Sequence, residues 1–228
     1  MKVDLHVHSH YSQDSLARPE ELVYWMAKRG LGAMAITDHD AIEGARETAA
    51  LAPGAIIIGE EIRTSRGEII GLFLQELIPP HLSPRETIER IHQQGGLVYI
   101  PHPTDRLRGS TLAPEALQAV LPLVDLMEGY NARALCNHVN RRAAALAREH
   151  GLPVGAGSDA HRACDVGLAY VEMAPFRDAR GLLAALAESR IQGRLTGPLG
   201  RLSSLQARLA RRAAQRRESP SADPGIED

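Results

Sequence analysis

The chain alternates short apolar segments, rich in valine and isoleucine, with longer segments in which apolar residues recur every three or four positions. The first pattern is typical of buried strands and the second of amphipathic helices. The expected strands are residues 2–8, 32–37, 55–60, 68–74, 96–100, 123–128, 153–157 and 167–172. The expected helices are residues 18–29, 40–51, 83–94, 113–120, 132–150 and 178–190. A strand followed by a helix, repeated about seven times, predicts a mostly parallel sheet, either closed into a barrel or open and doubly wound.

The pattern changes at Pro198. Arginines there surround Leu202, Leu205 and Leu209, which predicts a basic amphipathic helix, and the proline- and serine-rich end is typical of disorder. We therefore expect one domain over residues 1–197 and a tail over residues 198–228. The tail helix either packs its leucine face on the barrel or adds a weak, non-specific attraction to nucleic-acid phosphates.

Composition narrows the class of protein. With 228 residues, 44% of them hydrophobic, the chain can bury a substantial core, and its net charge of −2 excludes a globally basic nucleic-acid binder. No stretch approaches the roughly 18 apolar residues of a membrane span, and no secretory signal opens the chain, so a cytoplasmic protein without membrane contact is expected. Cys136 and Cys164 are too few for a disulfide framework and are expected to be reduced core residues. The oligomeric state is left open.

Side chains that bind metals follow six of the expected strands. In chain order these are His6 and His8, then Asp38, His39 and Asp40, then Glu60 and Glu61, then His102, then Glu128 and Asn131, then Asp159 and His161. Each group alone has an ordinary explanation as a surface histidine, a helix cap or a solvated acid. The carboxyl ends of parallel barrel strands share one face, so all six groups should converge there, where they would be costly to bury without cations. The sequence therefore predicts a metal site.

Ligand type indicates which metals fit. Imidazoles and carboxylates without thiolates suit Mn, Fe or Zn. The candidate ligands are His6, His8, Asp14, His39, Glu61, His102, Asp159 and His161. Eight ligands are too many for one tetrahedral ion, so two or three divalent ions are expected, with Glu61 able to bridge. Clustered ions lower the pKa of a bound water and clamp the oxygens of an in-line displacement, which is the chemistry of phosphate ester hydrolysis. Asp4 and Asp38 are candidates for fixing the imidazole tautomers.

The motifs DLHVHSHYSQDS, ITDHD, GEEI, GGLVYIPHP and GSDAH resemble, in the same order, those of the PHP family, named for polymerase and histidinol phosphatase. The resemblance covers residues 1 to about 195 and implies a distorted (β/α)7 barrel, similar to a TIM barrel, with a di- or trinuclear metal centre that hydrolyses phosphoesters. The family's metal ligands fall on the same eight residues. His6, His8, Glu61 and Asp159 are then expected to act catalytically through a metal-activated water. Some relatives draw a further histidine from the strand that ends here in Glu128 and Asn131, which leaves a third ion open.

Three arginines are expected to bind the substrate phosphate: Arg106 first, then Arg63 and Arg133. Only about forty residues separate Glu61 from His102, which leaves no room for an inserted lid and predicts an open mouth. The expected substrate is a small phosphomonoester or nucleotide. The alternatives are a nuclease that trims short oligonucleotides and a non-catalytic metal-binding PHP module. Hydrolysis of a C–N bond fits the HxH spacing, but neither lysine of the chain stands at the carboxyl end of an expected strand.

Overall fold

The computed structural model describes residues 1–197 of the 228-residue chain. The expected basic helix and disordered tail over residues 198–228 lie outside the described residues. Within residues 1–197, no helix is long and apolar enough to cross a membrane.

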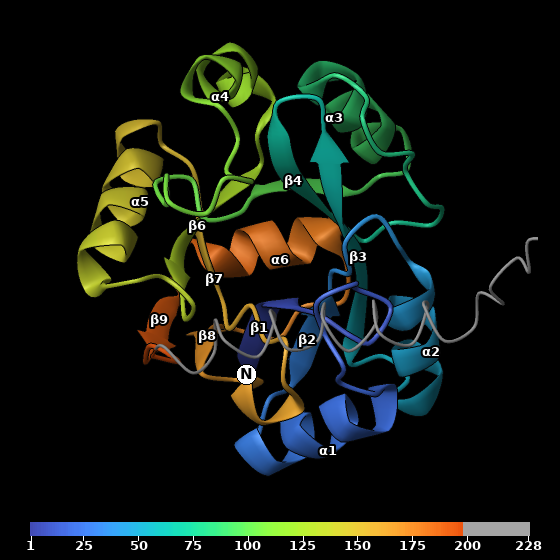
Figure 1. The fold of residues 1–228 in the computed structure, drawn as a ribbon. Helices are drawn as coiled ribbons and strands as arrows, with labels where there is room; N and C mark the ends of the chain where they lie inside the picture. The colour runs from blue at the N-terminus through green and yellow to red at the C-terminus, as the bar shows by residue number, and fades with distance from the viewer. Residues whose placement is uncertain (198–228) are drawn as a thin grey trace, which may run out of the picture.

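One mixed sheet winds into a nearly closed barrel with helices on its outside (Figure 1). Its strands follow the order β7-β6-β5-β4-β3-β2-β1-β8-β9. Their bounds are β1 Lys2–Val7, β2 Ala33–Ile36, β3 Ile56–Thr64, β4 Gly67–Leu72, β5 Leu97–Ile100, β6 Leu126–Asn131, β7 Val154–Gly157, β8 Ala169–Glu172 and β9 Arg190–Gly193. The barrel nearly closes because the end of β1 meets the chain after β7. There the amide of Asp159 donates to the carbonyl of His6 at 2.7 Å and the amide of His8 donates to that of Ala160 at 2.9 Å.

The helices agree closely with the expected segments. They are α1 Pro19–Arg29, α2 Glu43–Leu51, α3 Pro84–Gln93, α4 Pro114–Val120, α5 Asn137–Glu149 and α6 Ala179–Leu186. α3 shows why such boundaries can be read from sequence. The Ser83 hydroxyl accepts a hydrogen bond from the amide of Glu86, and the Glu86 carboxylate accepts one from the amide of Ser83. Pro84 occupies the first turn.

The apolar core fills one end of the barrel. Leu182 and Leu186 of α6, which crosses the centre of Figure 1, pack in one buried cluster with Val3, Leu5 and Tyr99 of the strands. Val3 and Leu5 precede the histidines of β1 along the strand. The carboxyl end of β1 is therefore left to polar side chains.

The strand directions differ from a mostly parallel sheet. The pairs β1–β2, β2–β3, β5–β6 and β6–β7 are parallel, but β4 runs antiparallel to both β3 and β5. The cause is a tight hairpin between Thr64 and Gly67, where Gly67 has a φ of 123° that favours glycine. β8 and β9 also pair antiparallel. β9 was not expected, because its sequence, Arg-Ile-Gln-Gly, carries only one apolar residue and no alternation.

The prediction that both cysteines lie in the core was wrong. Cys136 and Cys164 are free thiols but exposed. Cys136 precedes α5 and Cys164 lies in a 3-10 turn. Neither position belongs to a strand or to the buried face of a helix.

Candidate metal centre

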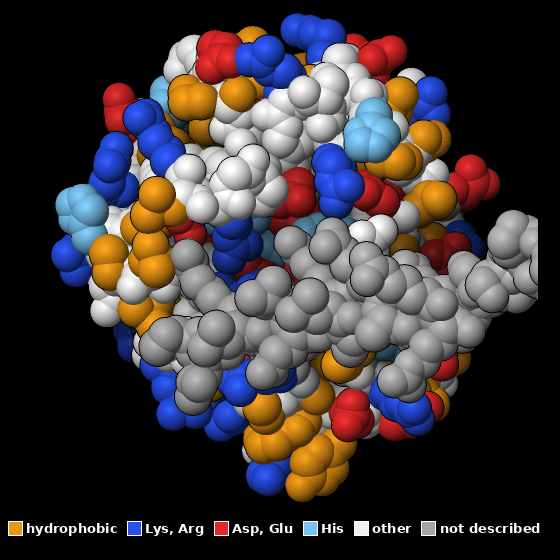
Figure 2. Space-filling view, viewed as in Figure 1, with side chains coloured by type: hydrophobic (Ala, Val, Ile, Leu, Met, Phe, Trp, Pro, Cys, Tyr) orange, Lys and Arg blue, Asp and Glu red, His pale blue; other side chains and the backbone are white. Residues whose placement is uncertain are grey.

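The eight predicted ligands converge at the carboxyl end of the barrel. Figure 2 shows acidic, basic and histidine side chains gathered around the hollow on this face. Seven of the eight are buried, and His39 is partly exposed. Three overlapping sets of donor atoms each lie within 4.8 Å of one another: His8, His39 and His161; His6, His8 and Glu61; and His39, Glu61 and Glu68. Glu68 was not among the predicted ligands.

The tautomers of His6 and His8 are set by partners outside the cluster. His6 Nδ1 lies 3.1 Å from Oε1 of Glu128, and His8 Nδ1 lies 3.0 Å from the Ser12 hydroxyl, which itself donates to Asp38 at 2.7 Å. Nδ1 of each ring is therefore engaged by its partner, which leaves Nε2 as the nitrogen that can bind a metal. The two Nε2 atoms lie 3.0 Å apart, and each lies 3.3 Å from Oε2 of Glu61. Protons or a cation must lie between these three atoms, and the donor set fits a divalent metal ion.

A second group lies beside it. His161 Nε2 and His39 Nε2 are 3.2 Å and 3.7 Å from Oδ1 of Asp14, and the ring centroids of His8 and His161 are 4.2 Å apart. Burial, together with the charge of Arg133, lowers the pKa of His161 to about 3. The imidazole is thus neutral at physiological pH, the form that binds metals.

In the absence of metal, His6 and His8 neutralise the carboxylates around them, because these carboxylates raise the pKa of both histidines. Burial alone would lower the pKa of His8, but the hydrogen bonds that its ring donates to Asp159 and Glu61 raise it to about 9. Burial would raise the pKa of Glu61, but His6 and His39 hold it well below its usual range. Protons therefore occupy the space between these ligands, and metal binding must displace them.

Among the arginines of residues 1–197, Arg108 and Arg133 reach the centre. Arg108 Nη1 lies 2.5 Å from Oδ2 of Asp159, and Arg133 Nη1 lies 3.4 Å from Oδ1 of the same carboxylate. Arg63 stands at the rim with its side chain 50% exposed. Arg106 is exposed and lines a separate groove between α4 and α5. A cavity of about 380 Å³ opens onto the centre, lined among others by Arg63, Arg108 and Arg133.

Two of the predicted ligands have left-handed backbone. His102 has a φ of 33° and Asp159 a φ of 52°, values that side-chain-bearing residues rarely adopt. Each lies two residues after the end of a strand, where its side chain joins the group at the barrel mouth. Such strain persists only where the surrounding structure holds it, and it is typical of functional sites.

Glu128 and Asn131 orient their neighbours. Oε2 of Glu128 accepts the amide of His102 at 2.7 Å and the Asn131 side-chain amide at 2.9 Å, while Oε1 faces His6. The same Asn131 amide donates to Asp159 at 3.0 Å. Both oxygens of Glu128 are thus already engaged, which favours an orienting role over a ligand role. Asp4 does not touch an imidazole; it accepts the backbone amides of Ser158 and Gly167.

Glu68 was not predicted, because it stands at the start of a strand and not at the end of one. β4 is antiparallel, so its first residues lie at the mouth. The feature of the sequence that could have indicated this reversal was the short Ser65–Arg66 turn between two apolar segments. Arg106 and Arg108 lie two residues apart on one loop, and only the structure shows which of them turns inward.

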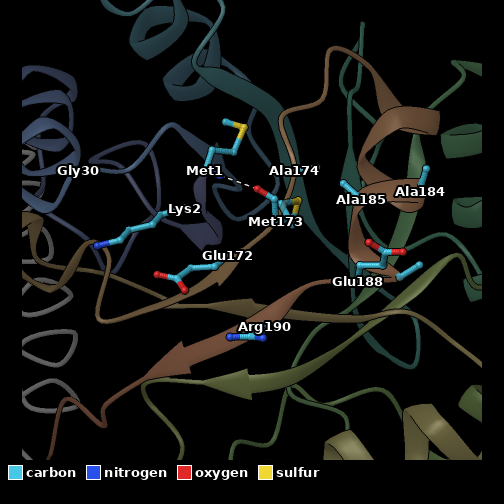
Figure 3. Close-up of a pocket in the computed structure, with 11 residues that line it drawn as sticks. Met1, Lys2, Gly30, Glu172, Met173, Ala174, Ala184, Ala185, Glu188 and Arg190 are labelled. Atoms are coloured by element: carbon cyan, nitrogen blue, oxygen red, sulfur yellow. Dashed lines mark hydrogen bonds between the residues drawn. The ribbon is translucent and has the colours of Figure 1, made fainter.

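A larger cavity, of about 650 Å³, lies elsewhere (Figure 3). It is lined by Lys2 at the start of β1 and by Glu172, Glu188 and Arg190, together with small and apolar residues. None of the predicted site residues lines it. Size alone therefore does not identify the functional site.

Comparisons with known proteins agree with this arrangement. The PHP domain model matches residues 4–138, and the PHP-associated model matches residues 137–191. The uncharacterized protein MJ1587 of Methanocaldococcus jannaschii is 39% identical over 152 residues, which cover 61% of this chain and 88% of that protein.

Solved structures show the same fold. One is a two-domain protein from Bacteroides vulgatus that contains a predicted PHP-like metal-dependent phosphoesterase; it is 20% identical, with a TM-score of 0.69 over 85% of this chain. Another is the lesion-specific endonuclease PfuEndoQ from Pyrococcus furiosus, 16% identical, with a TM-score of 0.56 over 83% of this chain. The chain spans 65% of the first of these proteins and 57% of the second. From the extent of the sequence match and the shared barrel, the chain belongs to the PHP domain family.

Proposed function

We propose that this protein is a metal-dependent phosphoesterase that hydrolyses a small phosphomonoester or a nucleotide. The observation that carries the proposal is the convergence of the His6 and His8 Nε2 atoms with Glu61 on one point. The family assignment and the phosphoesterase neighbour support it. A non-catalytic module is disfavoured because every principal ligand of the family pattern is retained.

The metal ligands in this proposal are His6, His8, Asp14, His39, Glu61, His102, Asp159 and His161, with two or three Mn, Zn or Fe ions. When bound, such ions supply an activated water and neutralise phosphate oxygens. The chain supplies the fixed tautomers: Glu128 holds His6, and Ser12 with Asp38 holds His8. His6, His8, Glu61 and Asp159 therefore act on the reaction through the metals they hold.

Arg108 and Arg133 are proposed to bind the phosphate. Their side chains, 17% and 11% exposed, reach the mouth cavity and approach the same carboxylate, Asp159. A guanidinium is charged at every physiological pH and binds phosphate oxygens in bidentate geometry. A substrate phosphate would draw these donors away from Asp159. Arg63, at the rim, contacts the part of the substrate outside the cavity.

The segment between Glu61 and His102 supports a small substrate. It contains the rest of β3, β4 and α3, and no inserted domain covers the mouth. A short oligonucleotide is the second candidate, supported by the PfuEndoQ fold neighbour and by Arg106, which lies on the mouth loop and would contact a longer substrate. We place the protein in the cytoplasm, consistent with its two free cysteines.

A substrate panel tests the proposal. Protein stripped with a chelator and reloaded with Mn, Zn or Fe is assayed on p-nitrophenyl phosphate, bis(p-nitrophenyl) phosphate, nucleoside monophosphates and short 5′-phosphorylated oligonucleotides. Metal-dependent turnover that is lost in His6→Ala and Asp159→Ala supports a phosphoesterase, and the best substrate distinguishes a monoesterase from a nuclease. Stoichiometric metal binding without turnover on any substrate would instead favour a binding module.

A further inference from the structure

Glu68 is a buried carboxylate at the barrel mouth that the eight-ligand set does not use. It is the second residue of β4, it pairs with Arg63 of β3, and it is 4% exposed. Its amide donates to the carbonyl of Ser110 at 2.9 Å. The backbone of Glu68 is therefore held by β3 on one side and by Ser110 on the other, and its side chain faces the proposed metal ligands.

Glu61 and Glu68 span the same two histidines. Glu61 presents Oε2 to His39 Nδ1 at 3.2 Å and Oε1 to His102 Nε2 at 3.1 Å. Glu68 presents Oε1 to the same His39 nitrogen at 3.7 Å and Oε2 to the same His102 nitrogen at 3.8 Å. Each carboxylate thus offers one oxygen to each imidazole.

These separations indicate shared ions rather than hydrogen bonds. The contacts of Glu68 exceed the usual hydrogen-bond range of about 2.7–3.2 Å. They match the spacing of two ligand atoms that each lie roughly 2.0–2.2 Å from one ion. Two buried carboxylates side by side also repel each other unless a cation lies near both.

We infer that Glu68 is a ninth metal ligand, which bridges together with Glu61 between an ion at His39 and an ion at His102. The inference deepens the proposed function and rests on its metal centre. The alternative is that Glu68 has a purely structural role. Its carboxylate would then be held by Ser110 and by the charge of Arg108, which both lie on the mouth loop.

The number of metal ions bound per chain distinguishes a ligand role of Glu68 from a structural role. Chelator-treated wild type, Glu68→Ala and Glu68→Gln are equilibrated with Mn²⁺, desalted and measured by inductively coupled plasma mass spectrometry. The matched control is Glu60→Gln, because Glu60 is buried on the neighbouring strand β3 but accepts the amide of Ile78 instead of facing the histidines. We expect both Glu68 variants to bind one ion fewer per chain and Glu60→Gln to bind as many as wild type.

The thermal midpoint of the metal-free protein is the second readout. Glutamine has the size of glutamate and carries no charge that Glu61 could repel, so metal-free Glu68→Gln should unfold at or above the wild-type midpoint. A lowered midpoint or unchanged metal content overturns the inference. Wild-type protein that binds no Mn²⁺ would instead contradict the proposed function itself, so the two failures are distinguishable.

Discussion

Nδ1 of His6 lies 3.1 Å from Oε1 of Glu128, which stands 122 residues later in the chain. This contact places the ring proton on Nδ1 and leaves Nε2 facing His8 and Glu61. Because Glu128 also accepts the amide of His102, one carboxylate positions two of the proposed ligands from different strands. The proposed metal centre therefore depends on a residue that need not touch a metal.

Replacement of Glu128 should weaken metal binding without removing a ligand. A partner that orients a metal-binding histidine is typically worth about 10- to 100-fold in metal affinity. We expect a loss of that size for Glu128→Ala in calorimetric Mn²⁺ titrations, while the exposed Glu149→Ala titrates like wild type. An unchanged affinity in Glu128→Ala would show that His6 needs no such partner.

Gly157 leaves no room for a methyl group beside the centre. A Cβ there would lie 2.2 Å from Cβ of His6 and 2.9 Å from Oε1 of Glu128. We expect Gly157→Ala to lose about 1–3 kcal/mol of unfolding free energy, as overpacked sites do, and to bind metal more weakly. Urea unfolding with and without Mn²⁺ measures both effects. Gly181→Ala is the control, because the nearest atoms to its Cβ would be Oδ1 of Asp178 at 3.2 Å and Cβ of Phe176 at 3.3 Å. Equal stability of the two variants would contradict the packing argument.

Arg108 and Arg106 should differ sharply as alanine variants. Arg108 reaches Asp159 at the centre, whereas Arg106 is exposed on the same loop. A hydrogen bond to a charged group is worth about 1.5–3 kcal/mol, so Arg108→Ala should lower kcat/KM roughly tenfold to hundredfold on a small phosphomonoester. Arg106→Ala should change it less than twofold on that substrate and more on an oligonucleotide. If Arg106→Ala costs as much as Arg108→Ala on the small substrate, the sequence ranking was correct and our placement of the phosphate is wrong.

The metal-free protein should lose stability as the pH rises from about 6.5 to 9. Burial raises the pKa of Glu60 and of Glu68 to about 8, and Asp159 and Glu61 overcome burial to raise that of His8 to about 9. The folded state thus binds more protons than the unfolded state over this interval, and the unfolding free energy falls with rising pH. Groups with lowered pKa values, such as His161, act below this window.

Bound ions should flatten this dependence, because they replace the protons at the ligands. Urea unfolding at several pH values, with chelator and with Mn²⁺, measures the difference. Metal-free protein that becomes more stable between pH 6.5 and 9 would contradict the protonation scheme.

Much of the site could be predicted because strand ends obey a geometric rule. His6 lies near the carboxyl end of β1, and His102 and Asp159 follow β5 and β7, so their convergence required only the order of elements and the shared face of a barrel. The rule fails where a strand reverses. Glu68 stands at the start of antiparallel β4, and a pattern of apolar and polar residues carries no information on strand direction.

The remaining misses have similar causes. Arg108 and Arg106 share one loop, and the direction of each side chain depends on tertiary contacts such as that to Asp159. β9 lies at the edge of the sheet and is mostly exposed, so its residues show no apolar alternation. Local sequence cannot encode such features.

The proposed function depends on a metal ion held by His6, His8 and Glu61 at the barrel mouth. An anomalous difference map from crystals of the protein grown with Mn²⁺ would locate this ion. We expect a peak roughly 2.0–2.2 Å from Nε2 of both histidines and from a Glu61 oxygen, with at least one further peak beside it. A map in which the Mn²⁺ peaks lie away from these side chains, or in which none appears, would contradict it.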